Sequence, residues 1–226
     1  MRLDGVTKPR FILNFHGLGD TVRKLPASEM DCWLDSMVFE KILDDVRGRK
    51  DVQITFDDAN ESDFAIALPL LKARNLSAHF FVVSKRIGQK SFLSLEQLRS
   101  LHAEHMVIGN HGMCHRNWRL LGEAELHEEL VEAKDALEQM IGVPVVEAAC
   151  PYGAYDRRVL RKLWHLGYKA VYTSDGGPTF MDSWLRARNT VRRSHNPERT
   201  RRSMNEIPSG GRRLWRELKL LIKRWR

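Results

Sequence analysis

The chain has 226 residues, of which 42% are hydrophobic and 29% are charged, a composition typical of one globular domain. It excludes a disordered, collagen-like or coiled-coil chain. The formal net charge is +8, but the last fifteen residues carry +6 of it, so the body is nearly neutral. The three cysteines have no CxxC spacing, no signal peptide is evident, and no stretch has the roughly 18 apolar residues of a membrane span. We therefore expect a cytoplasmic protein.

Short β-rich runs alternate with helical patterns along the chain, which predicts parallel strands joined by helical crossovers. We expect strands at 11–15, 52–56, 78–83, 106–109, 145–149 and 169–173. The helices between them are amphipathic; one opens with Ser94 and Gln97 in capping-box spacing, and another ends at Gly142. This pattern predicts an α/β fold, and it fits either a barrel or an open doubly wound sheet.

Polar residues that suit catalysis follow almost every predicted strand. They are His16, Asp57, Asp58, Asn110, His111, the segment 151–153, Ser174 and Asp175. The carboxyl ends of parallel strands meet on one face, where α/β enzymes build their active sites. We therefore expect these residues to come together.

Asp57 and Asp58 directly follow an apolar strand. Neighbouring residues at a strand end point in different directions, so one carboxylate can hold a metal ion while the other acts as a base. The alternative is that one of them caps the following helix, because Asp favours the N-cap position.

His111 and His115 are four residues apart. If this segment is helical, both imidazoles lie on one face about a turn apart and suit one zinc-like ion. Two histidines, a carboxylate and an open position for water form a catalytic ligand set rather than a structural one. The alternative is a pair of unrelated surface histidines.

Three runs, in this order and spacing, resemble the polysaccharide deacetylase family (NodB homology domain, carbohydrate esterase family 4). They are ITFDD at 54–58, NHGMCH at 110–115 and CPYG at 150–153. With 15–17 and 78–83, the resemblance covers about residues 10 to 195. It implies a distorted (β/α) barrel of about seven parallel strands, one divalent metal ion, usually Zn²⁺, and hydrolysis of an N-acetyl group on a sugar.

The resemblance also implies roles for single residues. Asp57 would be the catalytic base, and Asp58, His111 and His115 would be the metal ligands. The metal would polarise the acetyl carbonyl and acidify a water molecule. The backbone N–H of Tyr152 would stabilise the oxyanion.

Two features of the family are missing at their usual places. The third motif commonly has an arginine where this chain has Ala149, and Arg188 is the candidate to supply the charge from a later strand. The late histidine that usually acts as general acid is not evident. His195, the only histidine after His165, is the candidate, although its surroundings also suit a solvated loop. Asp175 stands where the aspartate of the fourth motif is expected.

The segment 210–226 is predicted to be a basic amphipathic helix that follows a barrel domain at 1–209. Its apolar stripe includes Trp215 and Trp225, and Lys and Arg residues edge it. Such a helix suits an anionic membrane surface, so peripheral attachment to the inner face of the membrane is a prediction. The alternatives are docking on the barrel and binding of nucleic acid, and the two tryptophans favour the membrane over nucleic acid.

Together, these features predict a metal-dependent carbohydrate N-deacetylase that acts on an N-acetylated glycan or glycan precursor. A close alternative is an amidase that removes another small acyl group, such as formyl, from a lipid-linked sugar. If the missing arginine and general acid have no replacements, the chain is instead a catalytically weak barrel that binds a glycan or a partner at the membrane.

Overall fold

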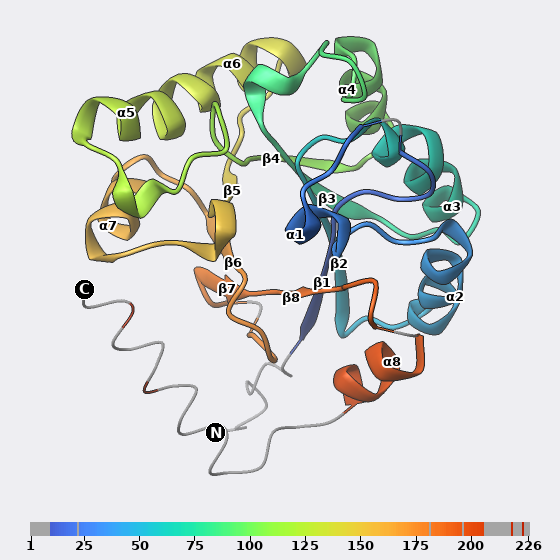
Figure 1. The fold of residues 1–226 in the computed structure, drawn as a ribbon. Coiled ribbons are helices and arrows are strands. Elements are labelled where there is room, and N and C mark those ends of the chain that lie inside the picture. Colours follow the sequence, from blue (N-terminus) through green and yellow to red (C-terminus); the bar gives the residue numbers. More distant parts are fainter. Residues whose placement is uncertain are drawn as a thin grey trace, which may run out of the picture.

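In the computed structural model, eight parallel strands form one sheet that curves into a nearly closed barrel, with the helices outside it (Figure 1). The structure describes residues 10–21, 23–180, 182–195 and 197–205, together with Leu218 and Lys223. The strands are β1 (Phe11–Phe15), β2 (Val52–Asp57), β3 (Ala78–Val82), β4 (Val107–Asn110), β5 (Glu147–Ala149), β6 (Ala170–Thr173), β7 (Leu185–Ala187) and β8 (Asn189–Thr190). Their order in the sheet is β7-β6-β5-β4-β3-β2-β1-β8.

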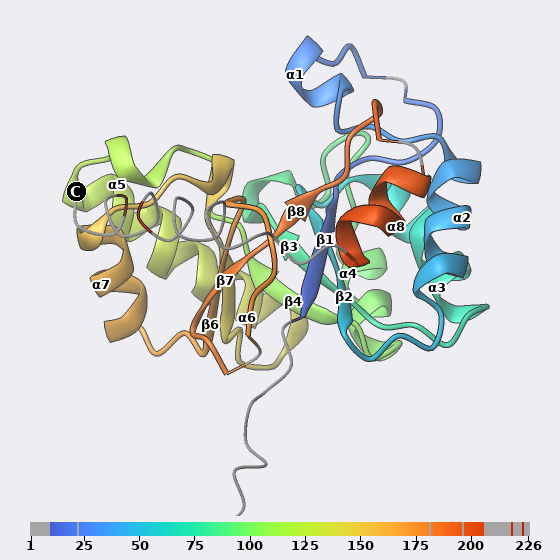
Figure 2. The ribbon, with the colours of Figure 1, turned by 90° about the horizontal axis from the view of Figure 1, so that it is seen from below.

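The helices cover the outside of the barrel. The α-helices are α1 (Ala27–Met30), α2 (Ser36–Val46), α3 (Leu68–Lys72), α4 (Leu95–Ala103), α5 (Glu123–His127), α6 (Ala133–Ile141), α7 (Arg157–His165) and α8 (Pro197–Asn205). The shorter turns are the π-helical η1 (Asp63–Ala67) and η4 (Glu128–Glu132) and the 3₁₀ turns η2 (Ser84–Arg86), η3 (Trp118–Leu120) and η5 (Pro151–Gly153). Helices α2, α3 and α8 lie on one side of the strands, and α5 and α7 on the other (Figures 1 and 2).

The barrel closes at Arg188. Strands β7 and β8 stand at opposite edges of the sheet, where β7 pairs with β6 and β8 pairs with β1, and only this residue separates them in the chain. The predicted barrel is confirmed, with eight strands where about seven were expected. The sequence pattern missed β7 and β8, which have three and two residues and are too short for a period of two to emerge.

The alternation of side chains along β2 sets what faces the barrel interior. Ile54 and Phe56 belong to the main hydrophobic core outside the sheet. Gln53, Thr55 and Asp57 alternate with them. Gln53 hydrogen-bonds to Tyr172 of β6 across the interior, whereas Thr55 and Asp57 hydrogen-bond to Asn14 of the neighbouring strand β1. A strand with a period of two therefore delivers Asp57 to the inside of the barrel at its carboxyl end.

The predicted boundary between 1–209 and 210–226 lies outside the described residues, as does the tail helix apart from Leu218 and Lys223. None of the helices that the structure describes is long and apolar enough to cross a membrane.

Candidate active site

The carboxylate of Asp57 is buried inside the barrel. Asn14 of β1 donates to its Oδ2 at 2.9 Å, and Arg188 donates to Oδ1 and Oδ2 at 2.6 and 2.8 Å. Burial by itself raises the pKa of Asp57, but the charge of Arg188 and then that of His111 outweigh it and hold the pKa well below its ordinary value. Asp57 is therefore an ionised carboxylate at neutral pH.

Arg188 is fully buried at the junction of β7 and β8. Its Nη1 also donates to Oδ1 of Asn14 at 2.8 Å, and its backbone N–H and Nε contact the carbonyl oxygen of Thr173 at 3.0 and 3.3 Å. The structure thus places Arg188 against Asp57, while the position where the family commonly has arginine is Ala149 on β5.

Asp58 has its backbone in the left-handed region, at a φ of 84°, and its side chain has partners different from those of Asp57. Its Oδ1 accepts from Nη1 of Arg86 at 2.7 Å and lies 3.4 Å from Nε2 of His115. Burial raises the pKa of Asp58, but the interactions with His115, His16 and Arg86 outweigh burial and hold the pKa below its ordinary value. Neither aspartate caps the following helix, because the N-cap of η1 is Ser62. The capping alternative is therefore wrong.

His111 and His115 lie in a loop after β4, not on a helix. Gly112 and His115 have φ values of 90° and 59°, and this turn brings the two imidazole rings to a centroid distance of 4.9 Å. The helical case considered for the pair does not apply, but the loop brings the two imidazoles together all the same.

A buried carboxylate holds this loop. Glu129 of η4 accepts from the backbone N–H of Cys114 at 2.9 Å and from Nε1 of Trp118 at 3.2 Å. A Cβ on Gly112 would lie 2.1 Å from Oε2 of Glu129, so glycine is required there by space as well as by its φ. Glu129 is not among the site residues predicted from the sequence. Its place three residues after Leu126, on the apolar stripe of the helix, was the available signal of a buried charge.

Asp58, His111 and His115 fit a divalent metal ion. Each offers one ligand atom, and these atoms lie within 4.8 Å of one another. Nδ1 of His111 is 2.8 Å from the carbonyl oxygen of Ala149, which fixes the proton on Nδ1 and leaves Nε2 free. Burial lowers the pKa of His111 to about 4 and also lowers the pKa of His115. Both are neutral at pH 7, as metal ligands must be.

His16, which follows β1, also reaches the site. Its Nε2 lies 4.0 Å from Oδ2 of Asp57, and its Nδ1 is buried with no hydrogen-bond partner among the described residues. The sequence pattern placed His16 at the catalytic edge of the sheet but gave it no role. Its meeting with Asp57 follows from the direct pairing of β1 with β2, in which Phe15 lies beside Phe56.

Tyr152 lies beside the histidine pair. It is the middle residue of η5 and has φ 58° and ψ 10°, an unusual conformation for a residue other than glycine. Its ring centroid is 4.6 Å from that of His115, and its side chain is exposed. The predicted backbone donor is thus carried by a turn next to the metal-ligand candidates.

His195 is not brought to this site. It lies in the turn between β8 and α8, where its Nδ1 accepts from the backbone N–H of Arg192 at 3.3 Å. Burial lowers the pKa of His195. The positive charges of Arg199 and Arg192 lower it as well, and the carboxylate of Asp31 opposes them. Its surroundings agree with the loop interpretation of this residue more than with the role of general acid.

The sequence and the fold both have known relatives. A sequence model of the polysaccharide deacetylase family matches residues 44–171. A chitooligosaccharide deacetylase from a Bradyrhizobium species is 29% identical over 132 residues, which are 58% of this chain and 58% of that protein. The chain spans about half the length of the curated relatives it matches, 51% and 58% for two of them.

Two solved structures illustrate the likeness of fold. The deacetylase PplD of Streptococcus pyogenes, in complex with acetate, has a TM-score of 0.75, with 19% identity and coverage of 88% of this chain and 100% of its own. IcaB from Ammonifex degensii has a TM-score of 0.73, with 19% identity and coverage of 88% and 97%.

Proposed function

Because this chain belongs to the polysaccharide deacetylase family, we propose that it is a metal-dependent hydrolase that removes N-acetyl groups from an amino sugar in a glycan or glycan precursor. One arrangement carries the proposal. Asp57, kept ionised by Arg188, lies against the Asp58, His111 and His115 cluster, with its Oδ2 3.7 Å from Nε2 of His111. A carboxylate that lies next to the metal ligands, and is held by an arginine rather than by the metal, is suited to act as a base.

Each residue of the site has its own role in the proposed amide hydrolysis. A divalent ion held by Asp58, His111 and His115 would polarise the acetyl carbonyl and acidify an attacking water. Asp57 takes up the proton of that water on its carboxylate. Arg188 keeps Asp57 charged and oriented, and it also lowers the basicity of the carboxylate, so the water must already be acidic.

The tetrahedral oxyanion then needs a donor, and the leaving amine needs a proton. We assign the first task to the backbone N–H of Tyr152. We assign the second to His16, whose Nε2 lies on the Asp57 side of the site, rather than to His195. With these assignments, His16 stands in for the missing late histidine and Arg188 for the missing arginine of the third motif.

These replacements favour an enzyme over a glycan-binding barrel without turnover. The deformylase-type alternative uses the same residues, because a formamide and an acetamide differ only in the acyl substituent. The released acid therefore separates the two activities.

The experiment starts with protein freed of metal by a chelator and reloaded with one equivalent of Zn²⁺. Acetate and formate are then measured after incubation with N-acetylglucosamine oligomers, nucleotide-linked and lipid-linked N-acetyl sugars, and their N-formyl analogues. We expect one tightly bound zinc per chain and release of acetate. Formate alone would transfer the proposal to the deformylase alternative.

A matched pair of variants ties turnover to the site. His111→Gln removes one ligand candidate, whereas His127→Gln makes the same change at an exposed position on α5. We expect zinc binding and acetate release to fail together in the first and to stay intact in the second. A wild-type protein that binds no divalent ion, or equal zinc affinity in both variants, would overturn the proposal.

A further inference from the structure

The C-terminal segment reaches the wall of the active site through Lys223. Its Nζ donates to the carbonyl oxygen of Gly153 at 2.7 Å and to Oδ1 of Asp175 at 2.5 Å, and it lies 4.2 Å from the centroid of the Tyr155 ring. Gly153 ends η5, and Asp175 follows β6. One ammonium group therefore bridges two segments at the catalytic end of the barrel.

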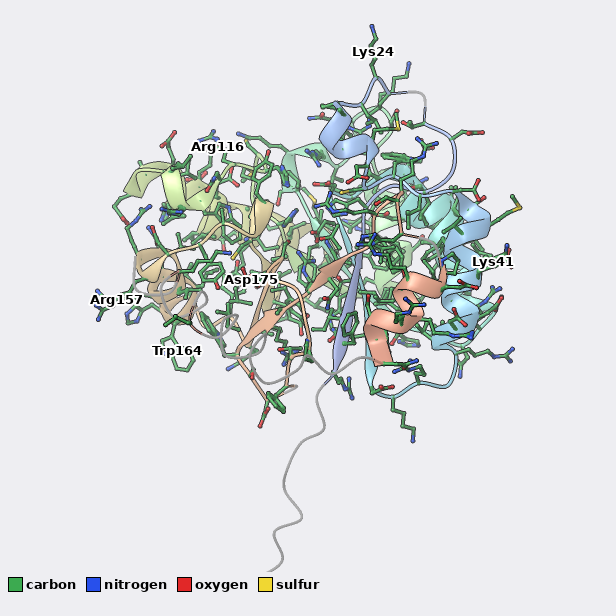
Figure 3. All side chains as sticks on the ribbon, turned by 60° about the horizontal axis from the view of Figure 1, so that its bottom comes forward. Lys24, Lys41, Arg116, Arg157, Trp164 and Asp175 are labelled. Atoms are coloured by element: carbon green, nitrogen blue, oxygen red, sulfur yellow. The ribbon has the colours of Figure 1, made fainter. Side chains whose placement is uncertain are left out.

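Asp175 needs this cation. Its side chain is only 10% exposed, and its Oδ2 accepts from the hydroxyls of Tyr155 at 2.8 Å and Thr173 at 2.7 Å. In Figure 3, Asp175 lies near the middle of the view, whereas Arg157 and Trp164 lie at the edge of the molecule. Lys223 adds a cation to these two neutral donors, so three groups hold the largely enclosed carboxylate.

The turn that Lys223 contacts also carries Tyr152. Tyr152 and Gly153 both have a positive φ, of 58° and 62°. A Cβ on Gly153 would lie 2.9 Å from the backbone nitrogen of Ser174, so the turn packs directly on the residue before Asp175. A backbone in this sparsely populated region persists only where its surroundings hold it.

We infer that Lys223 is a positioning residue for the active site. By joining the carbonyl oxygen of Gly153 to the carboxylate of Asp175, it fixes the turn 151–153 and with it the backbone N–H of Tyr152. The effect on catalysis rests on the proposed function, whereas the bridge itself does not. This role of Lys223 on the barrel does not depend on any membrane attachment.

The kinetic test uses the full-length, zinc-loaded protein and a soluble N-acetylglucosamine oligomer. Because small displacements of a catalytic group are costly, Lys223→Ala should lower kcat about tenfold or more, with KM within about twofold. Lys223→Arg should recover part of kcat. The control, Lys72→Ala, breaks a lysine–carboxylate pair with Glu104 on the outside of the barrel and should match wild type. In an Asp175→Asn background, Lys223→Ala should add little, because both changes break one bridge.

A second measurement does not depend on turnover. Amide hydrogen exchange should accelerate in the segment 150–155 of Lys223→Ala and remain unchanged in Lys72→Ala. If wild type releases no acetate, the proposed function fails while this comparison still tests the bridge. Unchanged exchange in Lys223→Ala overturns the inference, as does an equal loss of kcat in the wild-type and Asp175→Asn backgrounds.

Discussion

Arg188 donates two hydrogen bonds to the carboxylate of Asp57, at 2.6 and 2.8 Å, from a position 131 residues later in the chain. Both side chains are buried, and the arginine lies at the junction that closes the barrel. The same contact thus joins the last strands to β2 and keeps a carboxylate charged beside the metal-ligand candidates.

Removing the arginine alone should be costly. Arg188→Met leaves the buried carboxylate of Asp57 without its cation, and we expect the free energy of unfolding of the metal-free protein to fall by about 3 kcal/mol. The double variant Arg188→Met with Asp57→Asn removes both charges and should recover part of that loss. Urea unfolding at pH 7 measures both. A double variant that is less stable than Arg188→Met would contradict this account of the pair.

Glu129 should control metal affinity without touching the metal. Both carboxylate oxygens of Glu129 accept a hydrogen bond, one from Cys114 and one from Trp118. Glu129→Gln replaces one of these oxygens with an amide group that only donates, so the loop that carries both histidines should loosen. We expect zinc affinity to fall about 10- to 100-fold in a competition titration with a chromophoric chelator. The control, Glu132→Gln, makes the same change at an exposed position of η4. Equal affinities in the two variants would show that the loop does not depend on Glu129.

Replacing His16 should slow hydrolysis mainly for substrates whose leaving group needs a proton. His16→Gln should lower acetate release from an N-acetyl sugar about 100-fold or more, because an amine leaves poorly without a general acid. Hydrolysis of 4-nitrophenyl acetate, whose leaving group needs no proton, should fall much less. His195→Gln should change neither rate. A large loss with the amide in His195→Gln, and none in His16→Gln, would return the acid role to His195.

The buried histidine predicts how the metal-free protein responds to pH. Burial lowers the pKa of His111 from 6.5 to about 4, so between these values the unfolded chain binds a proton that the folded chain refuses. The free energy of unfolding should therefore be highest above about pH 6.5 and fall as the pH drops towards 4. Asp57, whose pKa is also lowered, extends the loss to more acidic pH.

This pH dependence is measurable by urea unfolding of the chelator-treated protein at pH 7.5 and at pH 5. His111→Gln removes the titrating group, so its stability should change less between the two values. A variant that loses as much stability as wild type would assign the effect to other groups.

Much of this site could be predicted because parallel strands make it regular. The alternation of Gln53, Thr55 and Asp57 on β2 places Asp57 inside the barrel, and the ends of β1 and β4 bring His16 and His111 to the same edge. These features depend on local period and strand order, both of which are visible in the sequence.

The remaining features depend on contacts between distant segments. His111 and His115 lie in a loop and not on a helix, because Gly112 has a positive φ and Glu129 holds a loop there. Strands β7 and β8 are too short to show a period. The contact of Lys223 with Asp175 links residues 48 positions apart. The sequence pattern around Lys223 predicted membrane attachment, with docking on the barrel as an alternative.

The role of Asp57 is best measured by acetate release from zinc-loaded wild type, Asp57→Asn, and Asp57→Asn with Arg188→Met, at matched zinc content. We expect wild type to release acetate from an N-acetylated sugar. Both variants should bind zinc and be slower by about 1000-fold or more, since a metal centre without its base loses most of its rate. A zinc-bound variant that releases acetate at close to the wild-type rate would contradict this role of Asp57.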